Sequence, residues 1–170
     1  GVTFNSIFDD YCQSIGAVAL DPNDPDNTIY VGTGETWTRN SVSVGDGMYK
    51  SVDGGSNWTK MGFEKSERIA NIIVNPKNSK EIYVGVLGAL WGDSEERGVY
   101  KTTDGGQSWE LVLEIDKYTG VTDLIIDPRN PQVLYAAAMQ RSRKIFTYLG
   151  GGPGSGMHKT TDGGKTWDIS

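Results

Sequence analysis

The sequence predicts an all-β protein, a β-propeller built from four-stranded antiparallel blades. Three observations predict it: a short motif occurs three times, a pair of apolar segments repeats in step with it, and helical periodicity is absent. A repeat of about 50 residues that holds four short strands has the size of one propeller blade. We therefore expect blades at residues 14–63, 68–115 and 121–170.

The repeated motif has the pattern Ser/Thr-x-Asp-Gly-Gly-x-x-Trp and lies at 51–58, 102–109 and 160–167. Two adjacent glycines permit a tight turn, and the hydroxyl and carboxylate can hydrogen-bond the nearby backbone. We name the strands of a blade A to D from the inside out and place the motif on the C–D hairpin, with its tryptophan packed on the blade. The residues expected to hold this turn are Ser51, Asp53, Gly55, Trp58, Thr102, Asp104, Gly106, Trp109, Thr160, Asp162, Gly164 and Trp167.

An alternative role for the three motif aspartates is that of catalytic acids. Repetition argues against that role, because an active site needs one constellation of side chains whereas every blade needs the same turn. We therefore assign them a structural role and assign no catalytic residue within the chain.

A second element repeats with the motif. The apolar segment 17–20 leads through a Pro-containing turn to 29–32, and the same arrangement recurs farther along the chain. Short apolar runs rich in β-branched residues and bounded by Pro and Asn predict a buried strand, a turn and a second strand. These segments supply strands A and B of each blade.

The start of the chain predicts a further strand. Residues 1–4, Gly-Val-Thr-Phe, match the end of the motif, so residues 1–9 are expected to hold the outer strand of a preceding blade. Three blades and one strand do not close a ring, because propellers need at least four blades. We expect the chain to be a segment of a larger propeller.

Composition limits the classes of partner. The formal net charge is -6, and no basic stripe is present that would bind nucleic acid. No apolar run is long enough to span a bilayer, so a membrane-embedded protein is not expected. We expect neither a cofactor nor a metal site, because the acidic turn at 21–26 does not have EF-hand spacing.

On these motifs the chain resembles the BNR, or Asp-box, repeat β-propellers, with the greatest likeness to secreted bacterial sortilin-type (VPS10-like) propellers, often labelled "glycosyl hydrolase, BNR repeat". The resemblance covers essentially the whole chain and implies the fold. It implies function only loosely, because the superfamily includes sialidases, xyloglucanases, peptide-binding sortilin receptors and photosystem assembly factors.

The catalytic motifs of the enzyme branches do not match. The Arg-Ile-Pro motif of sialidase-like members meets Arg68-Ile69-Ala70 here, and no Arg-His-Asp-Asp-like string of the xyloglucanase-like members is found. Blades outside this chain could carry such residues.

Topology predicts a working face. The A–B turns and motif turns should share one rim, so the B–C and D–A loops should form the other, where the three copies diverge. Aromatic and arginine side chains are typical of recognition surfaces. Each of these residues taken singly could equally be a solvated loop side chain. As a set, the candidate ligand-binding residues are Trp37, Arg39, Trp91, Glu96, Arg97, Arg141, Arg143 and Tyr148.

Our leading expectation is a non-catalytic scaffold or binding module outside the cytoplasm (secreted, periplasmic or cell-surface) that recognises protein or peptide on the B–C rim. The alternative is a glycoside hydrolase domain that acts on polysaccharide, which would need two carboxyl groups about 5–10 Å apart. A further alternative is an accessory subunit that caps a membrane or envelope complex.

Overall fold

The computed structural model describes residues 3–37, 39 and 41–169, which form β-strands and, within that part of the chain, no helix. The first sheet contains β1 (Ile15–Leu20), β2 (Ile29–Thr33), β3 (Met48–Ser51) and β4 (Thr59–Lys60). The second contains β5 (Ile69–Asn75), β6 (Asn78–Val86), β7 (Gly98–Thr102) and β8 (Glu110–Leu113). The third contains β9 (Thr119–Ile126), β10 (Leu134–Lys144), β11 (Thr147–Gly150), β12 (Gly156–Thr160) and β13 (Asp168–Ile169).

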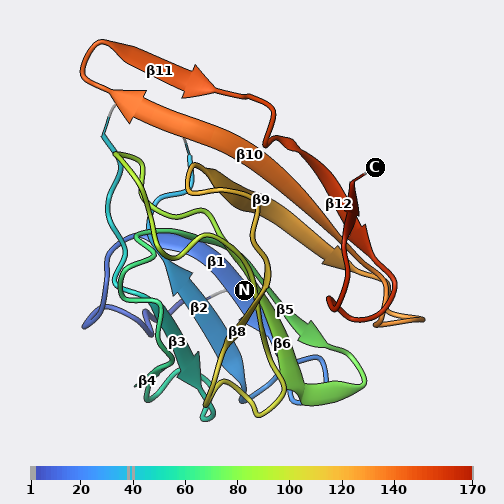
Figure 1. Ribbon diagram of the computed structural model, residues 1–170. Coiled ribbons are helices and arrows are strands. Elements are labelled where there is room, and N and C mark those ends of the chain that lie inside the picture. Colours follow the sequence, from blue (N-terminus) through green and yellow to red (C-terminus); the bar gives the residue numbers. More distant parts are fainter. Residues whose placement is uncertain (1–2, 38, 40, 170) are drawn as a thin grey trace.

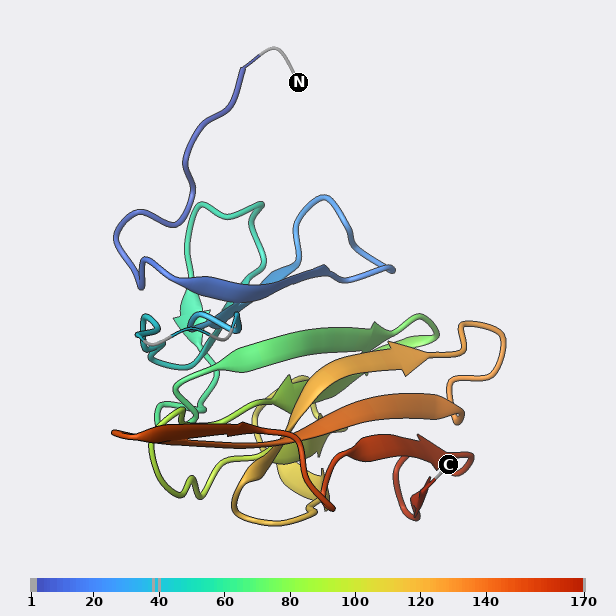
Figure 2. The ribbon, with the colours of Figure 1, turned by 90° about the horizontal axis from the view of Figure 1, so that it is seen from above.

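The predicted all-β architecture of four-stranded antiparallel sheets is confirmed. Every paired strand runs antiparallel to its neighbour, and the first two sheets keep the order of the chain. Figures 1 and 2 show the sheets as successive layers, with β1 in the first, β5 in the second, and β9 and β10 in the third. The blade limits given above stay a prediction.

Two apolar cores lie between the sheets. Tyr30 and Met48 of the first sheet pack with Ile69 and Val84 of the second, and all four are fully buried. A second core joins the second sheet to the third. Because each sheet buries one face against the next, burial of apolar area between blades stabilises the stack.

The motif turns share most of their hydrogen bonds in all three sheets, and among the described residues the first sheet lacks the bond from the amide that follows the two glycines. In the second sheet the Thr102 hydroxyl donates to Asp104 Oδ1 (2.6 Å) and accepts from the Gly106 amide (3.0 Å). The same Oδ1 accepts from the amides of Gln107 (2.8 Å) and Ser108 (3.1 Å). Gly106 has φ of +94°, a conformation that disfavours residues with a Cβ atom.

The motif turn of each sheet is also tied to the turn between its two inner strands. The first of the two motif glycines donates its amide to a backbone carbonyl of that inner turn at 2.9–3.0 Å in every sheet. The pairs are Gly54 to Asn27, Gly105 to Lys80 and Gly163 to Gln132. The A–B turns and the motif turns therefore share one rim, which places the remaining loops on the opposite rim.

Two segments differ locally from what the sequence indicated. Residues 3–9 form no strand, and Gly1 and Val2 lie outside the described residues. A strand needs a paired neighbour, and within the described residues no strand pairs with this segment, although Phe8 packs against Tyr49 of β3. Instead, Ile7 accepts a hydrogen bond from Trp58 Nε1 (2.8 Å), and Phe8 packs against the ring of Trp58.

The second difference concerns the third sheet, where the segment around Arg141, Arg143 and Tyr148 was expected to be a B–C loop. β10 continues past the blade and pairs with β11, from Arg141 opposite Gly150 to Lys144 opposite Thr147. Arg141 and Arg143 therefore lie on a strand, and Tyr148 lies on its partner. The resulting hairpin projects from the sheet (Figure 1).

Replacing Asp104 with alanine should lower the melting temperature by several degrees at pH 7, because the turn loses its acceptor. Hydrogen bonds hold the pKa of Asp104 well below its ordinary value. The ionised carboxylate therefore stabilises the folded state fully above pH ~4. This stabilisation should fade as the pH falls through the folded-state pKa. Thermal unfolding followed by circular dichroism from pH 7 to pH 2 measures this difference.

The exposed Glu110→Ala variant is the control. If Asp104→Ala melts at the same temperature as this control at pH 7, the turn does not depend on the carboxylate.

Candidate functional site on the loop rim

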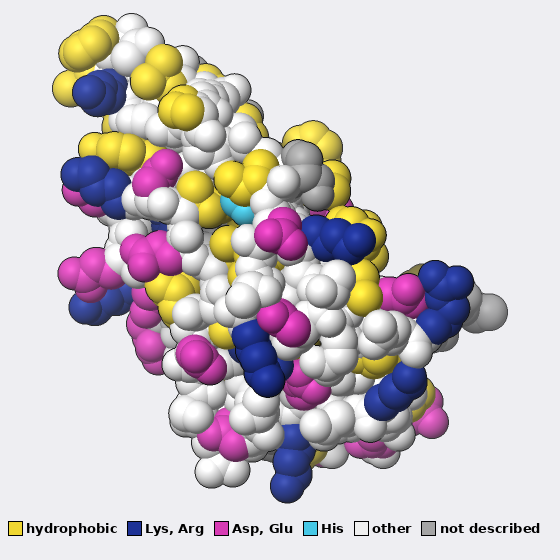
Figure 3. All heavy atoms as spheres, turned by 45° about the vertical axis from the view of Figure 1, so that its right-hand side comes forward, with side chains coloured by type: hydrophobic (Ala, Val, Ile, Leu, Met, Phe, Trp, Pro, Cys, Tyr) yellow, Lys and Arg dark blue, Asp and Glu magenta, His cyan; other side chains and the backbone are white. Residues whose placement is uncertain are grey.

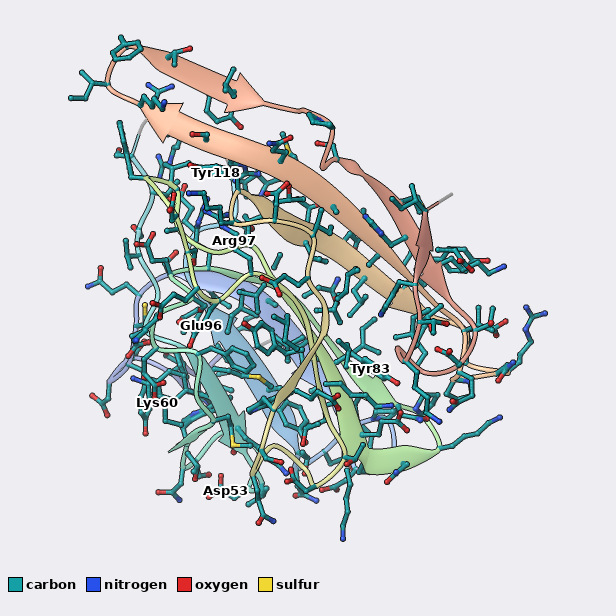
Figure 4. All side chains as sticks on the ribbon, viewed as in Figure 1. Asp53, Lys60, Tyr83, Glu96, Arg97 and Tyr118 are labelled. Atoms are coloured by element: carbon teal, nitrogen blue, oxygen red, sulfur yellow. The ribbon has the colours of Figure 1, made fainter. Side chains whose placement is uncertain are left out.

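The loops opposite the motif turns are held together by backbone hydrogen bonds. The amides of Gly45 and Leu87 donate to the carbonyls of Glu67 (2.8 Å) and Arg68 (3.0 Å). The Arg141 amide donates likewise to Tyr118 (2.9 Å). Each bond joins a B–C segment to a D–A segment, so both kinds of loop form one rim. Figure 4 shows Arg97 and Tyr118 at the end of the molecule opposite Asp53.

Five of the eight candidate ligand-binding residues have side chains near the rim surface. Trp37 is 83% exposed, Trp91 is about half exposed, and Arg39 pairs with Glu35 (2.5 Å). The Arg143 guanidinium lies 5.8 Å from the ring centres of both Trp91 and Tyr148. Cation–π contacts thus join the long loop of the second sheet to the hairpin of the third.

The two other arginines are buried, which the sequence did not indicate. Arg97 is 3% exposed and Arg141 is 5% exposed. Arg97 donates from Nη1 to the Leu87 carbonyl (2.6 Å) and from Nη2 to the Ala89 carbonyl (2.6 Å). Arg97 therefore positions the 87–92 loop from inside the protein and is not a solvated recognition residue.

Gly88 allows this packing. Its φ is +76°, and a Cβ atom there would lie 2.5 Å from Arg97 Cγ. A side chain at position 88 would therefore displace the guanidinium from the carbonyls that it holds.

Glu96, the remaining candidate, is half-buried, and its Oε2 has no hydrogen-bond partner among the described residues. Burial raises the pKa of this carboxyl, and the neighbouring Glu64 and Glu95 add to the shift. Glu96 does not line either hollow described below.

Arg68 is a rim residue whose role sequence reasoning missed. It is 0% exposed and directly precedes β5. Its Nε donates to the Gly88 carbonyl (2.8 Å), whereas Nη1 and Nη2 have no partner among the described residues. Burial lowers its pKa to about 10, and the charges of Arg141 and Arg97 contribute. Arginines 68, 97 and 141 therefore form one buried cationic cluster.

A hollow of about 690 Å³ opens on the rim above the second sheet. Lys65 and Lys117 form ion pairs with Glu95 (3.3 Å) and Asp93 (3.0 Å) at its edge. Its lining comes from the B–C loop of the second sheet and the two D–A loops beside it. The lining residues are Lys65, Glu67, Ala89, Asp93, Ser94, Glu95, Arg97, Glu114, Asp116 and Lys117.

Glu67 is the distinctive carboxylate of this hollow. It is half-buried, and its side chain has no hydrogen bond or ion pair within the described residues. Its φ is +59°, an uncommon conformation for a residue with a side chain, and such strain clusters at functional sites. Asp116, by contrast, accepts from the Tyr118 amide (2.7 Å) and the Thr119 hydroxyl (2.9 Å).

The D–A loops that carry Glu67, Glu114 and Asp116 could have been included from the sequence, since topology already placed them on this rim. The motif repeats drew attention to the B–C loops instead. Nothing in the sequence indicated the strain at Glu67.

A smaller cleft of about 240 Å³ lies between the sheets and contains one cationic side chain. The first sheet's loop supplies Thr36 and Trp37. The second supplies Ala70 and Leu87, and the third supplies Thr122 and Arg141. Aromatic, hydroxyl and guanidinium groups thus converge here without a carboxylate.

Comparison with known proteins establishes the family. Residues 46–169 match the family model described as Sortilin-Vps10: sortilin, neurotensin receptor 3. The chain belongs to the Sortilin-Vps10 family. Its fold is thus a BNR/Vps10-like β-propeller, as the sequence resemblance implied.

Two similar curated proteins are named as xyloglucanases. A probable oligoxyloglucan-reducing end-specific xyloglucanase of Neosartorya fischeri is 28% identical over 167 residues, covering 89% of this chain and 17% of the relative. Xyloglucanase Xgh74A of Acetivibrio thermocellus is 28% identical over 117 residues, covering 56% of this chain and 12% of the relative. The chain spans less than a fifth of these relatives' lengths.

Solved structures support the fold. An ancestral GH74 enzyme superposes with a TM-score of 0.67 at 23% identity, covering 93% of this chain and 18% of that one. The GH74 enzyme of Niastella koreensis gives a TM-score of 0.62 at 23% identity, covering 94% of this chain and 23% of that one.

Within the described residues of our chain, no helix is long and apolar enough to cross a membrane.

These relatives correct the expected function. A non-catalytic module that recognises protein or peptide was the wrong leading expectation, because the similar proteins are named xyloglucanases and GH74 enzymes. They favour the glycoside hydrolase alternative. The motif repeats misled us because they report only the shared turn, whereas a catalytic carboxylate occurs once and leaves no repeat.

The buried Arg97 gives a test of rim packing. Arg97→Met should lower the free energy of unfolding by about 2 kcal/mol, because three backbone carbonyls of the 87–92 loop lose their donor. Arg129→Met, at an exposed position on the opposite rim, is the matched control and should change stability little. Urea unfolding of both variants measures the effect, and equal midpoints would contradict the positioning role.

Proposed function

We propose that the polypeptide containing this chain is a glycoside hydrolase that acts on polysaccharide, and that this chain supplies part of the loop rim that meets the substrate. The observation that carries the proposal is the 28% identity to a named xyloglucanase along 89% of the chain. Polysaccharides are too large to cross a membrane, so we place the activity outside the cytoplasm.

The rim holds the chemical groups that such a reaction uses. Hydrolysis of a glycosidic bond usually requires two carboxyl groups, one as general acid and one as base or nucleophile. The larger hollow has Glu67 and Glu114 among its lining carboxylates. Most of the others are held by lysines or by backbone amides, so we propose Glu67 as one of the two catalytic carboxyl groups.

Exposed tryptophans on the same rim are suited to a sugar chain. Trp37 in the first sheet's loop and Trp91 in the second sheet's loop are exposed, and aromatic faces pack against sugar rings. The predicted ligand-binding role of Trp37, Trp91, Arg143 and Tyr148 stays a proposal, now directed at saccharide.

Glu67→Gln in the full-length polypeptide should lower kcat on xyloglucan about 100-fold or more, because the amide can neither donate nor accept the transferred proton. The melting temperature should stay close to that of the wild type, since the Glu67 carboxylate bonds no other described group. Release of reducing sugar measures the activity.

Glu64→Gln, three residues away and outside the hollow, is the matched control and should retain full activity. Wild-type activity in Glu67→Gln would remove Glu67 from the mechanism. Failure of the wild-type polypeptide to cleave any polysaccharide would overturn the proposed function.

A further inference from the structure

The buried arginine cluster lacks a negative partner. Arginines 68, 97 and 141 are each at most 5% exposed, and none forms an ion pair with a described carboxylate. The charge of Glu67 acts on Arg68 and Arg97 without reaching ion-pair distance. A buried cation is costly unless a counter-charge or hydrogen-bond acceptors compensate it.

Hydrogen bonds satisfy this cluster only in part. Arg97 is supplied with backbone carbonyls, whereas both Nη atoms of Arg68 are unpartnered. Arg141 donates from Nη2 to the Met139 sulfur (3.7 Å), a weak acceptor, and its Nε and Nη1 have no partner among the described residues. With Arg97 Nε, five buried guanidinium nitrogens of the cluster therefore have no hydrogen-bond acceptor among the described residues.

Burial lowers the pKa values of all three arginines, and Arg68 and Arg97 also feel the charge of Arg141. An anion placed at Arg141 would therefore relieve repulsion across the whole cluster as well as satisfying Arg141 itself.

Arg141 is the member of the cluster that lines the smaller cleft. Trp37 provides an exposed aromatic face there, Thr36 and Thr122 provide hydroxyls, and no acidic side chain lines the cleft. A planar guanidinium recognises a carboxylate by paired hydrogen bonds. An aromatic face and hydroxyl groups suit a hydroxylated ring that carries that carboxylate.

We infer that the cleft between Trp37 and Arg141 binds the carboxylate of a uronic acid residue, so that saccharides with an acidic sugar bind there in preference to neutral ones. This inference rests on the proposed function, and it specifies the class of saccharide. The Trp37 ring stacks on the uronate ring, and Arg141 holds the carboxylate. The positive charge of the buried Arg68 adds to the attraction.

Binding of a matched pair of disaccharides tests the inference. Cellobiouronate and cellobiose differ only in a carboxylate at the terminal sugar, and isothermal titration calorimetry with the full-length polypeptide gives a Kd for each. We expect cellobiouronate to bind at least about tenfold more tightly, as one charge-assisted contact allows. Equal affinity for the two sugars would overturn the inference.

Variants separate the cleft from general charge. Arg141→Gln should remove the preference for cellobiouronate, whereas Arg129→Gln, which makes the same change in net charge on the opposite rim, should keep it. If Arg141→Gln does not fold, Trp37→Ala replaces it, because Trp37 is exposed and its loss should weaken binding of both sugars without unfolding the chain. Undiminished binding in Trp37→Ala would overturn the stacking role.

Sodium acetate distinguishes a sugar site from a simple anion site. Acetate should compete only at concentrations far above the Kd of cellobiouronate, and competition at equal concentration would overturn the saccharide assignment. The outcome is separable from that of the proposed function. Hydrolysis of xyloglucan without a preference for cellobiouronate defeats this inference alone, and a preference for cellobiouronate without hydrolysis of any polysaccharide defeats the proposed function alone.

Discussion

The hydrogen-bonded turn of the Asp-box is the constraint on which the rest of the structure depends. In each sheet a Ser or Thr hydroxyl and an aspartate carboxylate hold the outer hairpin, and the turn's glycine amide ties it to the inner hairpin. The aspartate carboxylates form hydrogen bonds within their own turns, so they do not contribute to a site on the opposite rim. The Asp-box rim therefore has the same turn in all three sheets, whereas the B–C and D–A loops on the other rim differ from sheet to sheet.

The loop rim has no repeated turn motif, and this explains why buried arginines hold its loops. The loops between blades have no motif to hold them, and the structure uses buried arginines instead: Arg97 and Arg68 bind the carbonyls of the 87–92 loop. Arg141 extends this cationic cluster toward the third sheet. The hairpin of β10 and β11 projects beyond it, and hydrophobic side chains gather at that end of the molecule (Figure 3), including exposed Ile145 and Phe146.

The sequence predicted the fold well because its information is repeated. Three copies of one motif, with apolar segments in step, leave few alternatives to stacked four-stranded sheets. The β10–β11 hairpin was missed because it occurs once, so no repeat pointed to it. The outer strand expected at residues 1–9 stays a prediction, because it would pair within a preceding blade that this chain does not contain.

The site was predicted less well than the fold, for a physical reason. Arg97 and Arg141 resembled surface recognition residues, yet burial of an arginine depends on carbonyls and hollows that form only when distant loops meet. The strained backbone of Glu67 likewise lies against Gly34 and accepts a hydrogen bond from the Gly45 amide, and both glycines are far away in the chain. The expected function was wrong because it was inferred from repeated motifs, which determine the fold. Residues that perform chemistry occur once and are not marked by a repeat.

The central claim is that the rim of B–C and D–A loops meets saccharide while the Asp-box rim serves only the fold. A crystal structure of the full-length polypeptide with a bound oligosaccharide tests it most directly. Our account predicts sugar density along the loop rim, in contact with Trp37 and within reach of the hollow that contains Glu67. Sugar bound at the Asp-box turns, with the loop rim empty, would contradict it.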